Sequence, residues 1–369
     1  MNNITYSIPK DLVVSAGNYL GIKANRLAGY FGFAESSQSV KIEEGWEEVL
    51  PIILKPRNFT GMTALFEDDS FLFTNIVTSE EEAAFCGQEE GNLKIMPMSQ
   101  MEIIELLSSY LKETEDRQKI KQELSIDALI CMLSIADSIK RAKLENILNP
   151  SKTEFVITEE ILQIEFQYNQ ESRNLRWLSA FLAELRWESK PLDFKKALKE
   201  LSKAGIIRYK DSSVEVSEDG EIFFEELLKR KTILGLRSVF YHQGVINYLA
   251  MALMRTENYL WLLDVTDKAC IMSLNYEELQ GMIGTMISPG EEPPEIEALT
   301  TDDTEIKMKA ERSAEPNADV EAEIKVETKA ESEDINKEQK KSITPKFCRN
   351  CGQKLSSGSK FCKKCGTKI

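Results

Sequence analysis

The sequence predicts an α+β protein. Its body has two pseudo-twofold-related halves that share one antiparallel sheet, with a helical and winged-helix segment between them. A disordered acidic linker and a four-cysteine metal site follow the body. Three observations predict this: a strand meander followed by a helix occurs twice, helical periodicity fills the space between, and two Cys-x-x-Cys knuckles end the chain. The 369 residues are 42% hydrophobic and 29% charged, which excludes a wholly disordered chain.

The charge balance restricts the partners of the body. With 46 Lys and Arg against 61 Asp and Glu, the net charge is −15, so the average surface repels nucleic acid and anionic membranes. The longest apolar stretch, around Val245 to Met254, is far shorter than the ~20 residues of a membrane span. The N-terminus lacks the basic start and apolar core of a signal peptide. We expect a cytoplasmic protein without membrane contact.

The repeat emerges when the chain is compared with itself. Residues 63–78 align without gaps to residues 251–266 at an offset of 188, and residues 95–107 then match residues 271–283 at an offset of 176. A twelve-residue difference in one loop accounts for the change of offset in this alignment. Each copy has the pattern strand, polar turn, strand, connection, strand, helix.

Turn and cap residues support this pattern in both copies. The polar turns are Asp68-Asp69 and Thr256-Glu257, and the closing helices begin after the N-caps Ser99 and Asn275. A few strands backed by one helix leave an edge and a face uncovered. Two copies can cover each other, whereas two unrelated β-meanders that align by chance are the alternative.

The chain between the copies has helical periodicity. Predicted helices run from Leu124 to Leu148, from Thr158 onward, from Asn174 to Trp187 and from Leu192 to Ala204. Strands at 206–209 and 214–216 then form a hairpin, and Ser217 caps one more helix. Helices followed by a two-stranded wing are the winged-helix order, here at about residues 158–230.

A winged helix can read DNA or serve as a scaffold for protein contacts. In the DNA reading, Lys195, Lys196, Lys199 and Lys203 enter the major groove and the wing contacts phosphates. The wing and the helix after it are acidic, however, so they repel phosphates. This opposes DNA binding, because high affinity takes roughly 6–10 phosphate contacts. The scaffold reading is favoured and the DNA-binding regulator remains the alternative.

No catalytic constellation is found, so a non-enzyme is predicted. The single histidine, His242, lies in a predicted hairpin turn, and neither a Gly-rich phosphate loop nor a Gly-x-Ser-x-Gly elbow occurs. Cys86, Cys131 and Cys270 have apolar surroundings and are expected as small buried hydrophobic residues. No residue of the body is therefore assigned to catalysis or to a cofactor.

The composition changes after the body, which we place at residues 1–288. Residues 289–346 hold 17 Asp and Glu against nine Lys and Arg, and we expect a disordered acidic linker. The first 288 residues carry a net charge of −13. Residues 347–369 hold six basic residues and no acidic one.

The C-terminal segment contains the same Phe-Cys-x-x-Cys-Gly knuckle twice. Four thiolates, from Cys348, Cys351, Cys362 and Cys365, can close a tetrahedral site around one Zn²⁺ without an open position, which is a structural zinc pattern. Two disulfides are the alternative, and they fit poorly with a chain expected in the cytoplasm. Metal binding should supply the folding free energy of so short a segment.

These knuckles resemble the short zinc-ribbon domains at the ends of many bacterial and archaeal proteins, and the resemblance implies an interaction module. The element order over residues 50–288 is similar to that of the EspG family, cytosolic chaperones of type VII secretion that hold helical-hairpin substrates through a sheet loop and a helical region. This resemblance transfers no named residue, and the acidic linker and the ribbon depart from the family.

The resulting prediction is a non-enzymatic cytosolic adaptor or chaperone-like protein. It binds a protein partner, with a type VII secretion substrate as the implied class, and the zinc ribbon is a second contact. Trp177 and Trp187 are candidate anchors for a partner helix, although core packing is the commoner fate of such side chains. Nucleic acid remains the alternative partner, through the winged helix or the basic ribbon.

Overall fold

A computed structural model describes residues 4–33, 40–80, 82–112, 119–148, 156–186, 191–265 and 269–294. The chain divides into two units, Met1–Glu315 and Pro316–Ile369, and every described residue belongs to the first. The strands are β1 (Tyr6–Pro9), β2 (Asn58–Leu65), β3 (Phe71–Thr78), β4 (Ala83–Glu89), β5 (Asn92–Met98), β6 (Lys121–Glu123), β7 (Ile157–Thr158), β8 (Ile207–Lys210), β9 (Ser213–Val216), β10 (Thr232–His242), β11 (Val245–Arg255), β12 (Leu260–Asp264) and β13 (Cys270–Leu274). The helices are α1 (Val13–Tyr19), α2 (Trp46–Leu54), α3 (Gln100–Leu111), α4 (Ile126–Leu148), α5 (Glu159–Glu171), α6 (Leu178–Leu185), α7 (Phe194–Lys203), α8 (Glu221–Leu228) and α9 (Tyr276–Ile287), with 3-10 turns η1 (Lys10–Leu12) and η2 (Arg26–Phe31).

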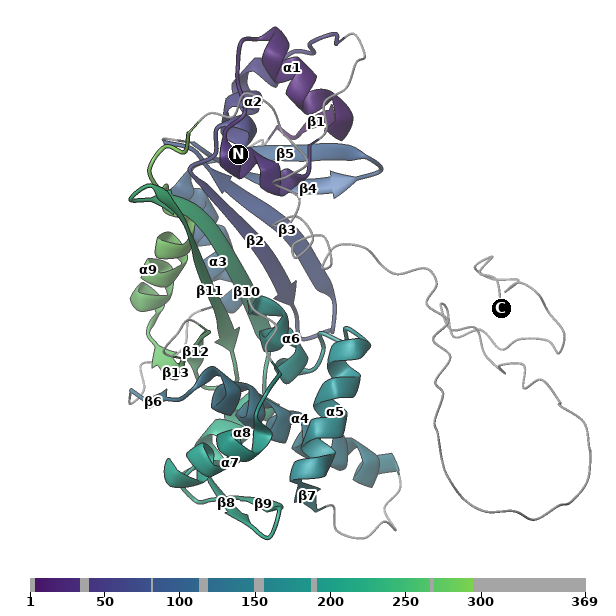
Figure 1. The fold of residues 1–369 in the computed structure, drawn as a ribbon, viewed down its shortest axis with the longest axis vertical. Coiled ribbons are helices and arrows are strands. Elements are labelled where there is room, and N and C mark those ends of the chain that lie inside the picture. The colour runs from purple at the N-terminus through teal and green to yellow at the C-terminus, as the bar shows by residue number, and fades with distance from the viewer. Residues whose placement is uncertain are drawn as a thin grey trace, which may run out of the picture. The chain divides into compact units, whose positions relative to one another are not determined.

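Within the described residues, ten strands form one antiparallel sheet in the order β1-β5-β4-β3-β2-β10-β11-β12-β13-β6 (Figure 1). The order is symmetric about the central pair of β2 and β10, in which Met62 lies opposite Leu236. Each half contributes a four-stranded meander and one closing helix, α3 or α9. The predicted pseudo-twofold body with a shared antiparallel sheet is therefore present.

The correspondence between the halves differs in part from the sequence alignment. Equivalent elements of the two halves, β2 with β10 through α3 with α9, begin 174 to 178 residues apart. The offset of 176 therefore agrees with the structure. The offset of 188 is wrong by one strand, because it aligned β2 and β3 with β11 and β12, whereas their structural equivalents are β10 and β11. Successive strands of a meander have similar apolar patterns and similar turns, so a slip by one strand still aligns well.

Both faces of the sheet are covered by helices (Figure 1). Alternation along β2 sends Met62 and Ala64 into a cluster with α3 and α9, while Leu65 joins the opposite face. On that opposite face α1, α2 and η2 form one cluster with the strands of the first half, and α4 with α6 forms another with the strands of the second half. No expectation from the sequence covered the N-terminal helices.

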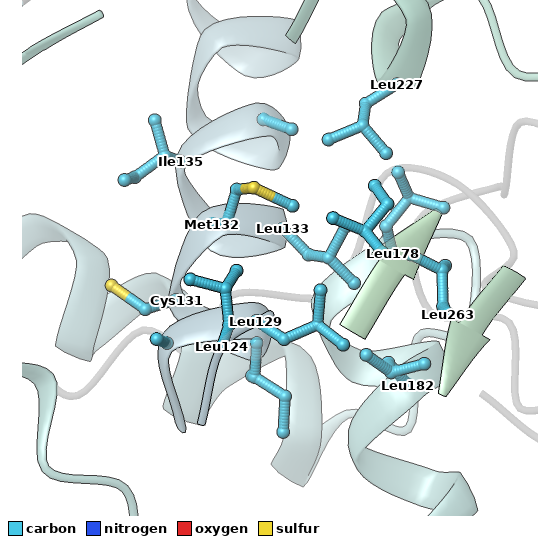
Figure 2. Close-up of a cluster of buried hydrophobic side chains, with 14 of the residues drawn as sticks. Leu124, Leu129, Cys131, Met132, Leu133, Ile135, Leu178, Leu182, Leu227 and Leu263 are labelled. Carbon is cyan, nitrogen blue, oxygen red and sulfur yellow. The ribbon is translucent and has the colours of Figure 1, made fainter. Parts of the chain in front are cut away.

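Helix α4 is the centre of the helical segment, which is the part of the chain from α4 to α8 between the two meanders. Residues 128–138 are buried on all sides of the helix. Leu129 and Leu133 point toward Leu178 and Leu182 of α6 and toward Leu263 of β12 (Figure 2). The helical segment is therefore packed onto the sheet through the first half of α4.

The small three-stranded sheet has the order β7-β9-β8. It follows the predicted wing hairpin, with Tyr209 opposite Val214, and adds the short strand β7. The helix predicted from Asn174 is shorter, because residues 174–177 form a turn and α6 begins at Leu178. The hydroxyl of Ser217 accepts from Gly220 N–H at 3.1 Å and stabilises the turn before α8, whose N-cap is Gly220 rather than the predicted serine.

Candidate partner-binding surfaces and metal site

The predicted zinc ligands Cys348, Cys351, Cys362 and Cys365 lie outside the described residues. Their chemistry fits zinc, because four thiolates in two Cys-x-x-Cys pairs form a closed soft-donor set. Among the residues that the structure describes, no group of three or more His, Cys, Asp or Glu side chains is placed to hold a metal ion.

The remaining cysteines are core residues, as the sequence predicted. Cys86, Cys131 and Cys270 are buried and separate. Burial raises the pKa of the Cys86 and Cys131 thiols above their ordinary value. These thiols therefore stay protonated and pack as small apolar groups.

His242 lies at the exposed end of the β10–β11 hairpin. Its Nδ1 is 3.2 Å from Oε1 of Glu291, and both side chains are about half exposed. The second oxygen of Glu291 accepts from Gln243 N–H at 2.8 Å, and Glu291 N–H donates to Tyr241 O at 2.8 Å. His242 thus helps to fasten the segment after α9 to the hairpin, beyond the predicted body boundary at residue 288.

Helix α7 presents a basic face. Ala197, Leu198 and Leu201 are buried, while the other side of the helix exposes all four of its predicted DNA-contacting side chains. Those side chains are Lys195, Lys196, Lys199 and Lys203. On the adjacent wing, Arg208 lies opposite Glu215, and this carboxylate reduces the net positive charge of the wing.

Trp177, a candidate anchor, is half-buried and already engaged. The guanidinium of Arg141 lies 4.9 Å from its ring centre, and the ammonium of Lys140 lies 5.9 Å from it. Trp187, the other candidate, lies outside the described residues. Trp177 therefore packs against α4 of its own chain, which is the commoner of the two fates considered for it.

Exposed apolar side chains gather instead on the helical segment. On α4, Leu144 is 48%, Ile147 74% and Leu148 76% exposed, and α5 exposes Ile164 and Tyr168 one turn apart. Side chains of this type in a group commonly mark an interaction site. Leu144, Ile147 and Leu148 belong to the apolar pattern that predicted this helix, but the spacing does not distinguish an exposed apolar face from a buried one.

A basic hollow lies beside the exposed end of α4, where α8 packs against it. The hollow has a volume of about 330 Å³. Its lining comes from α4 and from α8 with its C-cap: Lys140, Lys143, Leu144, Glu225, Leu228 and Lys229. No sequence pattern marks this group, because Leu144 and Glu225, the nearest lining residues of its two segments, are 81 positions apart and meet only in the folded chain.

Three comparisons with known proteins bear on these features. A zinc-ribbon domain model matches residues 347–369, the segment with the four predicted ligands. No curated protein matches the chain. Among solved structures, the chain has a weak structural likeness to the chaperone EspG5 of the Mycobacterium tuberculosis type VII secretion system, which was solved in complex with the PE25–PPE41 dimer.

That likeness has a TM-score of 0.39 at 7% sequence identity and covers 79% of this chain and 98% of the EspG5 chain. The C-terminal segment is a zinc-ribbon domain, a class that binds zinc. None of the helices in the described part of the chain is long and apolar enough to cross a membrane.

Proposed function

We propose that this protein is a non-enzymatic adaptor or chaperone-like protein that binds a partner protein through its helical segment. The supporting observation is the group of exposed apolar side chains on α4, where Ile147 and Leu148 are each about three-quarters exposed. Water contact is unfavourable for such side chains, so covering them with a partner surface contributes to binding.

A site-specific crosslink tests this proposal. A photo-reactive amino acid replaces Ile147 in the full chain, and Tyr19 of α1, which is 73% exposed, is the matched control position. We expect one dominant protein adduct from position 147 that the control lacks, and we expect L144D/L148D, added to the same photo-reactive chain, to abolish it. The same adducts at both positions, or none at position 147, would contradict the proposal.

The finer form of the proposal names the partner as a helical-hairpin substrate of type VII secretion in the cytoplasm. It is supported by the resemblance in element order over residues 50–288. Co-expression of the full chain with such a substrate, followed by size-exclusion chromatography, tests it. Co-elution in a fixed ratio is expected, and separate elution would leave only the general adaptor function.

The zinc ribbon is proposed as a second interaction module built around one structural Zn²⁺. Cys348, Cys351, Cys362 and Cys365 would hold the ion, which when bound would close this short segment without an open position for catalysis. Metal analysis of the purified full chain tests the count. One zinc per chain is expected, and a chain without zinc but with two disulfides would overturn the assignment.

A second candidate function is DNA binding by the winged-helix part. The exposed lysines of α7 and the strand order β7-β9-β8 favour it, while the acidic wing and the overall charge of −15 oppose it. A mobility-shift assay with random duplex at low salt separates the two functions. Binding that K195E/K199E abolishes would favour the regulator, and no binding would exclude it.

A further inference from the structure

The basic hollow between α4 and α8, with the side chains that continue its two walls, is called the α4–α8 groove. Each wall is a row of side chains on one helix. On α4, Lys140, Lys143 and Leu144 line it. Ile147 continues the same row, because these four positions follow the i, i+3, i+4, i+7 spacing of one helix face. The row ends in a side chain that is 74% exposed. The α4 wall thus begins basic and ends apolar.

The opposite wall comes from α8. Glu225 and Leu228 of α8 line the hollow together with Lys229, the C-cap of that helix. Ile222, 38% exposed, is one turn before Glu225 on the same face. Leu144 and Leu228, one from each wall, are the apolar side chains of the lining, and together they are called its apolar floor. Two neighbouring helices with apolar side chains between them form a surface against which a third helix can pack.

The charge of the groove is opposite to that of the protein. Its lining holds three lysines and one glutamate, whereas the chain as a whole has a net charge of −15. Among the lysines, Lys229 has a carboxylate partner, Glu257 at 3.0 Å, and this pair is about half exposed. A positive rim on an acidic protein favours a partner with negative charge at this place and disfavours other contacts.

A smaller polar hollow adjoins the groove. Lys140 and Leu228 line both hollows, and the smaller one adds Arg176 and Arg230. Its carboxylate, Asp137, is buried and accepts hydrogen bonds from α6, so it does not face the groove rim as an exposed charge. Arg230 is only 7% exposed and pairs with Asp69 at 3.5 Å, so Arg176 is the one of these two arginines that adds exposed positive charge.

The geometry favours a helix over a small anion. An isolated phosphate or carboxylate would gain from the lysines but would face Leu144 and Leu228 at the floor. Residues 140–148 of α4 span roughly 12 Å at 1.5 Å per residue, which matches two to three turns of a docked helix. Helix-in-groove recognition places apolar anchors at i, i+3, i+4 and i+7 against such a floor.

We propose that the α4–α8 groove binds an amphipathic helix of a partner protein, with apolar anchors against Leu144 and Leu228 and acidic residues facing Lys140, Lys143 and Lys229. This inference rests on the proposed protein-binding function and adds the class of segment that is bound. Because the rim is basic, the sign of the charge beside the apolar anchors decides whether a helix is accepted.

Two labelled peptides test the inference on the full chain by fluorescence anisotropy. Both are 18-residue helices with leucines at i, i+3, i+4 and i+7; one carries glutamates beside the leucines and the other carries lysines. We expect the glutamate peptide to bind at least tenfold more tightly at 50 mM salt, and its advantage to shrink at 300 mM salt. Equal binding of the two peptides, or no binding, would overturn the inference.

Matched variants locate the binding. K143E/K229E should weaken the glutamate peptide at least tenfold and improve the lysine peptide, and L144D should weaken both. K195E/K199E on α7 is the control with the same charge change on another exposed helix, and it should change neither affinity. Equal effects of the two double variants would overturn the groove as the site.

The outcome is separable from that of the proposed function. If the crosslink at position 147 captures a partner but the peptides are not distinguished, the helix inference fails and the adaptor function stands. If a variant fails to fold in a thermal melt, the preference of the unmodified chain between the two peptides still decides the inference.

Discussion

The hydroxyl of Ser179 donates a 2.6 Å hydrogen bond to the carboxylate of Asp137 inside the core. The backbone N–H groups of Leu178 and Ser179 donate to the same carboxylate at 3.0 and 2.9 Å. Trp177, the N-cap of α6, supplies no side-chain cap, so the cap comes from α4 instead. A carboxylate satisfies unpaired N–H groups at a helix N-terminus and complements the helix dipole. Asp137 therefore fixes the start of α6 on α4.

The pH dependence of stability should report on Asp137. Burial raises its pKa to about 6, although the hydrogen bonds from Ser179 act in the opposite direction. The unfolded pKa is about 3.9, so the contribution of this group to the free energy of unfolding is full below pH ~4 and is lost as pH rises through ~6. Relative to D137N, the wild type should lose about 2–3 kcal/mol between pH 4 and pH 7. Urea denaturation across this range measures it; parallel curves for the two proteins would contradict the assignment.

Close packing at Gly235 of β10 predicts a local steric cost. A Cβ placed there would lie 2.8 Å from Leu185 Cδ2 and 2.9 Å from Phe181 Cε1, both on α6. G235A should destabilise the protein by about 1–3 kcal/mol, because α6 must move away from the sheet. The control is G87A in β4, where an added Cβ meets nothing within 4 Å and should have little effect. Chemical denaturation of both variants decides between a packing effect and a general loss of glycine.

The two closing helices begin with matching capping boxes. Ser99 and Glu102 form one at α3, and Asn275 and Glu278 form the other at α9. S99A and N275A should each cost about 1 kcal/mol. Because the two caps serve separate helices of the pseudo-twofold pair, the double variant should show nearly the sum of the two costs. Strong non-additivity in thermal unfolding would show that the two helix starts are coupled.

Zinc removal should affect the ribbon and leave the body intact. C348S and C362S should each lower the zinc content of the purified chain to near zero, because three thiolates close the site poorly. S357A, in the same segment but outside the predicted ligand set, is the matched control. The denaturation midpoint of the body should remain unchanged in all three variants. Full zinc retention in C348S would contradict its role as a ligand.

Much of the fold could be predicted because its signals are local. The cap residues Ser99, Asn275 and Thr158 lie next to the helices that they begin, and the polar turn at Asp68-Asp69 connects two apolar strands. Helix α4 was found from its apolar periodicity. Each of these signals acts over a few residues, so it is readable without knowledge of the fold.

The features that the sequence predicted wrongly or left open depend on contacts between distant segments. α6 begins at Leu178, since its N-terminus is capped by Asp137, which lies 41 residues earlier. The repeat alignment slipped by one strand because β2 and β11 carry similar patterns, and only strand pairing shows that β2 and β10 are the symmetric partners. For Trp177 the sequence left partner contact and core packing open, and only the structure shows that Arg141 packs against its ring.

The sequence by itself determined the class of the fold, its internal duplication and the four-cysteine segment at residues 347–369, because hydrophobic period, caps and ligand spacing are all written within short windows. Only the tertiary structure decided which strands meet at the centre of the sheet and which side chains of the helical segment stay exposed. Exposure depends on what packs over a residue, and Lys143 and Lys229 become neighbours of one groove only when α8 folds back onto α4. The same long-range packing buries the first half of α4 and leaves its last turns available to a partner.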